Sequence, residues 1–193
     1  MPAAMIHLLA ARDYDPAGDA RFLLGCIAPD YAHDRAFKDA IHLRDTEDRP
    51  GALAALRARL DLKDSYSLGW LLHLFTDLRW DSSYFRAYRE AHEAEEDWFR
   101  GYHRELHAAG YALYHRYPWA EGACAAILGV DLHSLPDTLP ADAHDMEEFR
   151  SILMEKTRES DPGIASAVFP VELVEDFARE TAAAFRRWLE ERA

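Results

Sequence analysis

The sequence has few cysteines and no long hydrophobic run. Its two cysteines, Cys26 and Cys124, are far apart and match no metal-binding or redox spacing, so we interpret both as small core residues. No window approaches the roughly 18 uncharged apolar residues that a membrane-spanning helix needs. The first apolar stretch, 3–11, also lacks a basic leader or cleavage site. We therefore expect a cytoplasmic protein without a transmembrane segment.

Basic residues are also in the minority. The chain has 22 lysines and arginines against 35 acidic residues, which gives a formal net charge of −13. This charge repels nucleic-acid backbones and anionic membrane surfaces, so we expect no strong nucleic-acid binding. A bound divalent ion can reverse the local sign of the charge, so a phosphorylated small molecule or a phospholipid head group stays open as a partner. The sequence leaves the oligomeric state open.

The pattern of apolar residues predicts one all-helical domain over 1–193, a bundle of several helices. Apolar residues make up 49% of the chain, enough for one shared core, and there is no repeat, low-complexity tract or strand pattern. Asp48, with Pro50 in the first turn, and Asp64 are suited to cap helices. An irregular loop is expected over 29–48, and helices are expected over 3–12, 21–28, 50–60, 65–80, 84–117, 118–129, 142–159 and 171–191.

Two polar side chains, His73 and Asp77, occur on a predicted helix that is apolar around most of its circumference. Residues four apart share a helix face, with Cβ atoms roughly 5–6 Å apart, so both side chains can reach one ion. An ionised aspartate in such a helix is costly unless it is paired or bound to a metal. A mutual hydrogen bond, or an ion pair between Asp77 and a basic residue of another helix, would explain the pair without a metal.

Three further residues extend this pair to a set of five. His7 is the one polar residue of the first apolar segment, Asp30 directly follows an apolar run that ends in proline, and His42 lies between two apolar residues. Singly, these are ordinary core, turn or loop residues. Together with His73 and Asp77 they form a set of imidazoles and carboxylates without thiolates, which suits zinc and also manganese or iron. We therefore predict a buried metal cluster within the helical bundle.

The order of these residues resembles a known family. After His7 come the strings Phe22-Leu-Leu-Gly-Cys-Ile-Ala-Pro-Asp30, Lys38-Asp-Ala-Ile-His42 and Leu68-Gly-Trp-Leu-Leu-His-Leu-Phe-Thr-Asp77. They are similar to the zinc-dependent phospholipase C family, which is related to the single-strand-specific P1-type nucleases. The order His, Pro-Asp, His and His-x-x-x-Asp is the specific part, and the similarity covers roughly the first 80 residues.

The resemblance implies a small intracellular, bacterial-type member of that family, with a helical fold around zinc that hydrolyses phosphate esters. One zinc would be held by Asp30, His42, His73 and Asp77. A second would be held by His7 and the other oxygen of Asp77, so that Asp77 bridges the ions. Asp30 is the candidate catalytic carboxylate, which would orient or deprotonate the attacking water. One to three zinc ions are implied, and manganese or iron stays open.

Two features depart from the family pattern. Secreted members use the mature amino terminus as a ligand, whereas this chain begins Met1-Pro2. The family's third zinc takes another histidine soon after the His-x-x-x-Asp pair, where this chain has serine and tyrosine. His92 and Glu96 have the residue types for this additional ion, but on a charged helix they could equally be solvated side chains.

Two other interpretations stay open. An HD-type phosphohydrolase would use His33 and Asp34 as its central pair, with His7 before and Asp77 after, although that pair normally lies on a helix. A non-catalytic helical module could instead hold one structural metal, or none, since structural sites are closed by four protein ligands whereas hydrolytic sites keep a position for water. No role is predicted for His103, His107, His115, His133 and His144.

Overall fold

Helices account for all the regular secondary structure in the computed structural model, which describes residues 3–32, 34–137, 139 and 142–191. This confirms the predicted all-helical fold. The α-helices are α1 (Ala4–Tyr14), α2 (Ala20–Gly25), α3 (Arg35–Ile41), α4 (Arg49–Arg59), α5 (Ser65–Trp80), α6 (Arg86–His92), α7 (Trp98–Arg116), α8 (Trp119–Leu128), α9 (Ala143–Arg158) and α10 (Val171–Glu190). Two short 3₁₀ helices, η1 (Ala28–Tyr31) and η3 (Leu132–Ser134), and a π-helical segment, η2 (Asp81–Phe85), lie between them.

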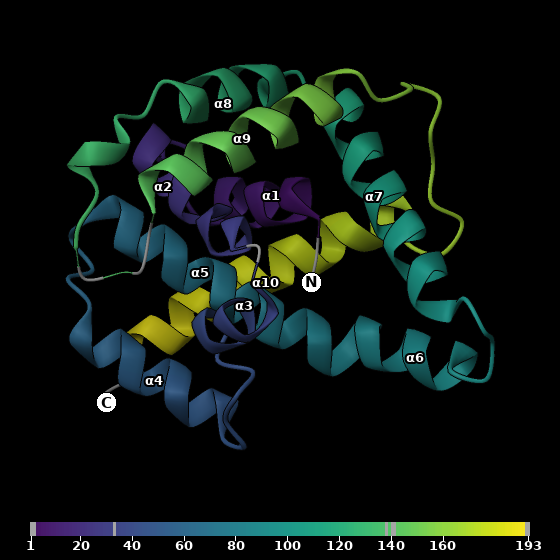
Figure 1. Ribbon diagram of the computed structural model, residues 1–193, viewed down its shortest axis with the longest axis horizontal. Helices are drawn as coiled ribbons and strands as arrows, with labels where there is room; N and C mark the ends of the chain where they lie inside the picture. The colour runs from purple at the N-terminus through teal and green to yellow at the C-terminus, as the bar shows by residue number, and fades with distance from the viewer. Residues whose placement is uncertain (1–2, 33, 138, 140–141, 192–193) are drawn as a thin grey trace.

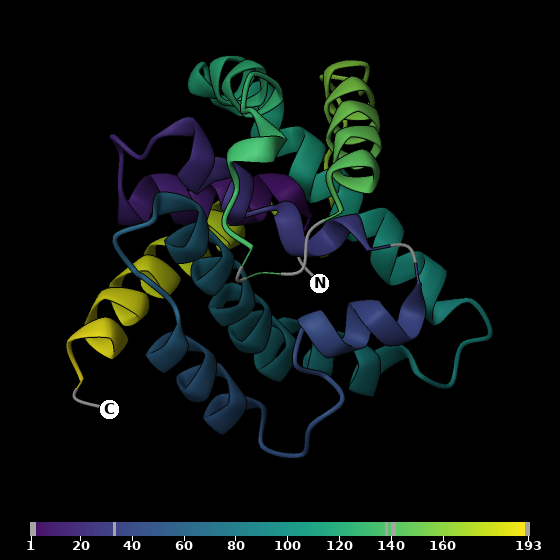
Figure 2. The same ribbon diagram turned by 60° about the vertical axis from the view of Figure 1, so that its left-hand side comes forward.

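The arrangement places α1 and α5 in the interior. Figure 1 shows α1 near the middle, with α8 and α9 on one side of it and α4 toward the opposite side of the molecule. Helix α2 packs closely on α5, and α10 packs along α1. The turned view in Figure 2 shows α8 and α9 lying together at the top of the molecule. No helix within the described ranges has the length and apolar character needed to cross a bilayer.

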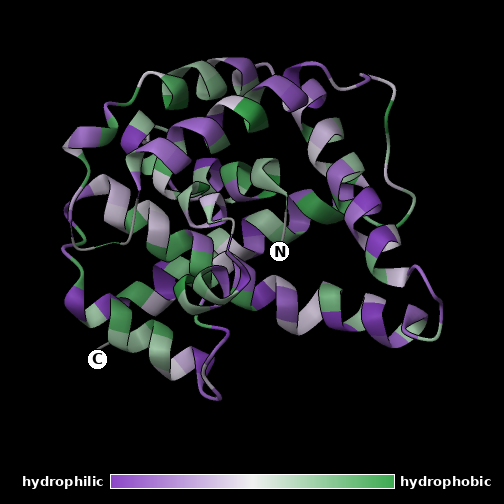
Figure 3. Cartoon of the chain, viewed as in Figure 1, coloured by the Kyte–Doolittle hydropathy of each residue, from purple (hydrophilic) through white to green (hydrophobic). Residues whose placement is uncertain are grey.

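The hydrophobic core is contiguous from α1 to α10. Every residue of α5 from Gly69 to Asp77 is buried, as its apolar circumference predicts. Hydrophobic residues follow the central α1, whereas α9 also carries hydrophilic residues (Figure 3). Helix α10, expected over 171–191, docks on this core through Val174, Phe177 and Phe185. Both cysteines are buried and unbridged, which confirms their prediction as core residues.

Aspartates cap the amino-terminal ends of many of these helices. Asp48 accepts a hydrogen bond from Gly51 N at 2.9 Å and Asp64 accepts one from Ser67 N at 2.8 Å, which confirms both predicted caps. A carboxylate there satisfies a backbone N–H that has no partner in the helix and interacts favourably with the helix dipole. The same arrangement recurs at Asp19, Asp34 and Asp142. Part of the acidic excess therefore defines helix ends.

The prediction of an irregular loop over 29–48 is wrong where η1 and α3 form, whereas 42–48 contains no helix. Pro29 lies in the first turn of η1, where its missing N–H costs nothing, and Asp34 caps α3. Helix α2 correspondingly ends at Gly25, earlier than the predicted 28.

The single long helix predicted over 84–117 is also wrong. The chain is π-helical over η2 and then forms α6 and α7, which meet at an angle in Figure 1. The break falls at 93–97, where four of five residues are acidic. Like charges on adjacent turns destabilise a helix there, and the turn lets Tyr102 of α7 pack against Tyr88 of α6.

Two glycines bring α2 and α5 into backbone contact. The Cα atoms of Gly25 and Gly69 face each other, and a methyl group added at Gly69 would lie 2.2 Å from Phe22 O. A methyl group at Gly25 would lie equally close, at 2.2 Å from Tyr66 O. Only glycine permits this crossing, which carries the carboxyl end of α2 up to the middle of α5.

Candidate metal centre

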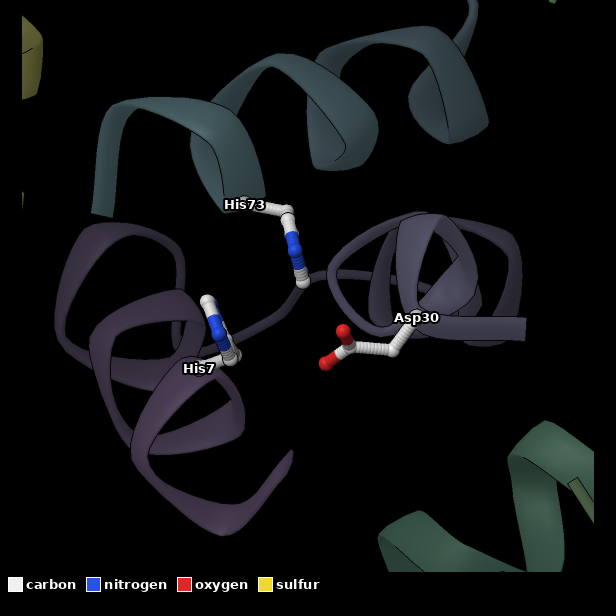
Figure 4. A group of neighbouring side chains, drawn as sticks. All are labelled: His7, Asp30 and His73. Atoms are coloured by element: carbon white, nitrogen blue, oxygen red, sulfur yellow. The ribbon is translucent and has the colours of Figure 1, made fainter. Parts of the chain in front are cut away.

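The five residues predicted from the sequence come together in the structure. His7 comes from α1, Asp30 from η1 and His42 from the end of α3, and α5 supplies His73 and Asp77. In Figure 4 the carboxylate of Asp30 points toward the two imidazoles of His7 and His73. The three histidines and Asp77 are buried, whereas the Asp30 side chain is 16% exposed. One edge of the cluster therefore reaches the surface.

Helix packing fixes the orientation of the His73 ring. Its Nδ1 lies 2.8 Å from Cys26 O, which the glycine crossing between α2 and α5 brings into reach. A carbonyl oxygen can only accept a hydrogen bond, so Nδ1 carries the proton. In the neutral ring Nε2 is then a bare lone pair that points into the cluster. Metal-binding histidines commonly have this arrangement, with the second nitrogen held by a carbonyl.

His42 is held in the same way. Its Nδ1 lies 2.7 Å from Lys38 O, so this nitrogen also donates and leaves Nε2 free. The next residue, Leu43, has φ of 56°, in the left-handed region that a residue with a side chain seldom adopts. This conformation ends α3 directly after His42 and costs about 1 kcal/mol or more. Strained backbone of this kind is found at functional sites more often than elsewhere.

The two free nitrogens face each other. His42 Nε2 and His73 Nε2 are 3.3 Å apart, so in the neutral rings two lone pairs converge without a proton between them. Such a contact is repulsive unless a cation, either a metal ion or a proton on one ring, accepts both lone pairs. A positive charge between His42 Nε2 and His73 Nε2 would therefore stabilise this arrangement.

The oxygens of Asp77 extend the cluster in two directions. Oδ1 lies 3.5 Å from His7 Nε2, and Oδ2 lies 3.7 Å from His42 Nε2 and 3.9 Å from His73 Nε2. Among the residues that the structure describes, neither ring nitrogen of His7 makes a hydrogen bond, and neither does Asp77 Oδ1. Buried polar atoms are almost always satisfied, so this group of unsatisfied atoms fits an ion-binding site.

The electrostatics favour the protonation state that metal binding requires. Burial, aided by the neighbouring His7, lowers the pKa of His73 to about 3, so its ring is neutral at neutral pH. Burial alone would raise the pKa of Asp77, but the adjacent His73 and His7 outweigh it and hold that pKa well below its usual value. The pKa of Asp30 is also lowered against the effect of burial, by His42, His73 and Lys38. Neutral imidazoles and ionised carboxylates are the forms that bind metals.

Basic side chains border the cluster, and sequence reasoning gave them no role. Lys38 Nζ lies 3.1 Å from Asp30 Oδ1, and Arg44 Nη2 lies 3.1 Å from Asp77 Oδ2 and 3.0 Å from Asp81 Oδ2. Arg49 Nη1 lies 2.7 Å from the same Asp81 oxygen. Lys38, Arg44 and Arg49 come from a stretch of the sequence rich in charged residues, so no sequence pattern distinguishes them from solvated residues. They hold both carboxylates of the cluster in place.

The described residues supply one position where several ligand atoms could surround an ion. Two sets of three ligand atoms, each within 4.8 Å of one another, are His7, Asp30 and His73, and His42, His73 and Asp77. Both sets need His73, which offers only Nε2 because Nδ1 is bound to Cys26 O. The sets therefore describe overlapping positions around one ion. Within the described part of the chain, a second ion beside His7 could take that residue, Asp77 Oδ1 and Asp30 as its ligands.

The other residues considered from the sequence lie elsewhere. His92 bonds Glu95 at 2.8 Å on the surface of α6, and Glu96 is exposed, so neither joins the cluster. Asp34 of the HD-type alternative caps α3 through Phe37 N at 2.8 Å. His33, its partner in that alternative, lies outside the described residues.

No protein-family description, curated protein or solved structure matches this chain. The resemblance to the zinc-dependent phospholipase C family consequently remains a prediction.

Proposed function

We propose that this protein is a metal-dependent hydrolase of phosphate esters, with zinc as the first candidate ion and manganese or iron as alternatives. The ion would be held around His73 Nε2 by His42, Asp77 and Asp30, with His7 at the far side. The observation that carries the proposal is the 3.3 Å contact between two imidazole nitrogens whose other nitrogens both donate to carbonyls. A divalent cation would satisfy both lone pairs at once, with Asp77 Oδ2, which lies 3.7 Å from His42 Nε2 and 3.9 Å from His73 Nε2, as a further ligand.

The partly exposed edge of the cluster supports a catalytic role. Asp30 is the one member that solvent reaches, and Lys38 places an ammonium group beside it. An ionised Asp30 can orient a water and accept its proton, and Lys38 can bind a phosphoryl oxygen. When bound, a divalent ion would lower the pKa of water and neutralise charge on the phosphoryl group. Hydrolysis joins the water oxygen to phosphorus, breaks the ester P–O bond and returns a proton to the departing alcohol.

Metal analysis and an activity panel test this proposal. Protein purified without chelator should carry at least one zinc, manganese or iron ion per chain. With added metal it should hydrolyse at least one substrate among aryl phosphates, phosphodiesters, nucleotides and phospholipids. His73→Ala should abolish this activity, whereas His115→Ala, an exposed histidine that contacts Ser160, should retain it. Equal rates for native protein and His73→Ala across the panel would refute the proposed activity.

A second candidate is a non-catalytic module with a structural ion. The observation in its favour is the complete burial of His7, His42, His73 and Asp77, which a closed structural site would show. In this case the metal raises thermal stability, but no substrate of the panel is turned over. Metal-dependent stabilisation without turnover would therefore favour this candidate over the hydrolase.

A further inference from the structure

A cavity of about 370 Å³ opens next to Asp30. It is lined by the first turn of α1, by α7 and by α9, and also by Asp30 and Lys38, which form an ion pair at 3.1 Å. Figure 1 shows α9 above the start of α1 and α7 to its right. Asp30 thus belongs both to the candidate metal centre and to the lining of this cavity. A molecule in the cavity would lie beside the one cluster residue that solvent reaches.

The wall of the cavity is mainly apolar. Helix α7 contributes Leu106, and α9 contributes Phe149, Ile152 and Leu153. Ile152 is 39% exposed and is one of the few large hydrophobic residues in the described structure that solvent reaches to this extent. Mainly apolar walls with a small number of polar groups are typical of sites for small organic molecules.

The charges at the cavity are opposite to those of the whole chain. The protein has a net charge of −13, yet the lining holds Lys38 and Lys156 and, as its one acidic residue, Asp30, which already pairs with Lys38. Lys156 makes no ion pair with any residue that the structure describes. His103 and His107 also line the cavity, and burial lowers the pKa of both, that of His103 to about 4. The unpaired charge of the lining is therefore positive.

The volume limits the size of the occupant. One water molecule takes up roughly 30 Å³ in the liquid, so the cavity corresponds to about a dozen non-hydrogen atoms. This size fits one aromatic ring with an anionic group attached. Burial of such a ring also uses the apolar wall, which a free phosphate ion would leave in contact with water.

We propose that the cavity binds a small aryl phosphate monoester, with its ring between α7 and α9 and its phosphate at Lys38, beside Asp30. Lys156 supplies positive potential that attracts the anion. The ring would contact Leu106, Phe149 and Leu153, and Ile152 would cover it from the solvent side. The assignment of this molecule as a substrate depends on the proposed hydrolase function, whereas its binding does not.

Phosphonates test binding without turnover, because their P–C bond is not an ester. We would titrate phenylphosphonate and methylphosphonate into metal-loaded and chelator-treated protein and measure affinity by calorimetry. The two probes share the anionic head and differ in the ring, so the apolar wall should make phenylphosphonate bind at least tenfold more tightly. Equal affinities, or no binding of either probe to folded protein, would overturn the proposal.

Substitutions at exposed positions locate the binding. Ile152→Asn should reduce the preference for phenylphosphonate, whereas Val168→Asn, a comparably exposed residue outside the cavity, should leave it unchanged. Lys156→Gln should weaken both probes to a similar extent, with Lys63→Gln as its exposed control. Circular dichroism checks that each variant is folded. If Ile152→Asn behaves like Val168→Asn, the ring does not lie in this cavity.

Turnover separates the two proposals. Binding of phenylphosphonate together with hydrolysis of phenyl phosphate supports both. Binding without hydrolysis retains the cavity as an anion site and counts against the hydrolase. Hydrolysis of phosphate esters with no preference for the aryl group retains the hydrolase and overturns the inference about the cavity.

Discussion

Replacing Asp77 with asparagine tests the candidate metal centre most directly, because the change removes a charge while keeping the shape of the side chain. Asp77 is fully buried and its two oxygens face different histidines. In the metal-free protein the variant loses the ion pair with Arg44, at 3.1 Å. Leaving a charged partner unsatisfied costs roughly 1–3 kcal/mol, and we expect the lower part of this range because Arg44 also contacts Asp81 and solvent.

The metal-dependent part of the stability distinguishes ligation from simple ion pairing. An ion present at 100 times its dissociation constant stabilises the native state by about 2.7 kcal/mol. For a domain of this size, each kcal/mol shifts the Tm by about 2–4 °C, so native protein should gain roughly 5–11 °C on addition of metal. Asp77→Asn should lose most of this gain and should bind less metal. His7→Ala should remove at most one ion.

Thermal unfolding with and without metal, together with elemental analysis, provides the measurement. Asp176→Asn is the matched control, since that residue pairs with Arg179 on the surface and should change stability by less than about 0.5 kcal/mol. An Asp77→Asn variant that is destabilised equally with and without metal, at unchanged metal content, would show that Asp77 pairs with Arg44 and binds no ion. Unchanged stoichiometry would also eliminate a bridging role.

Three further outcomes follow from the packing and the pKa shifts. Gly69→Ala should destabilise the protein by several kcal/mol and lower metal affinity, because the new methyl group meets backbone at 2.2 Å. Gly122→Ala, with no atom within 4 Å, should be neutral or stabilising by up to about 1 kcal/mol. Chemical denaturation measures both variants, and equal effects would contradict the close helix crossing. The metal-free protein should lose stability as the pH falls from about 6.5 toward 3, by up to about 1.4 kcal/mol per pH unit. The reason is that the pKa of His73 is lowered to about 3 in the folded state, so the unfolded state binds the proton first. The stability of a His73→Gln variant should depend less steeply on pH over this range, and an unchanged slope would contradict a neutral buried ring. Cys26 should react with a thiol reagent only on unfolding, since complete burial raises its pKa well above the usual value, and rapid reaction in the native state would contradict its burial.

Part of the fold followed from local patterns. The apolar circumference of α5 and the caps at Asp48 and Asp64 involve residues within one or two turns of each other, and helix formation responds to such neighbours. The predictions that were wrong concern 29–48 and 84–117, where the chain changes direction between short helices. The break between α6 and α7 allows an aromatic contact between helices, and periodicity along the chain carries no information about it.

The sequence by itself determined which residues could form the site. His7, Asp30, His42, His73 and Asp77 stood out because polar side chains within or beside apolar segments need partners, whatever the fold. Their types and order also defined the metals they could bind.

Only the tertiary structure decided how the five residues are arranged and what surrounds them. The crossing at Gly25 and Gly69 sets the Cys26 carbonyl against His73 and thereby fixes which nitrogen faces the cluster. The same folding brings Arg44 to Asp77 and α9 to the side of Asp30. Contacts between residues dozens of positions apart depend on helix packing angles, which arise from the whole core and are not encoded in any short segment of the chain.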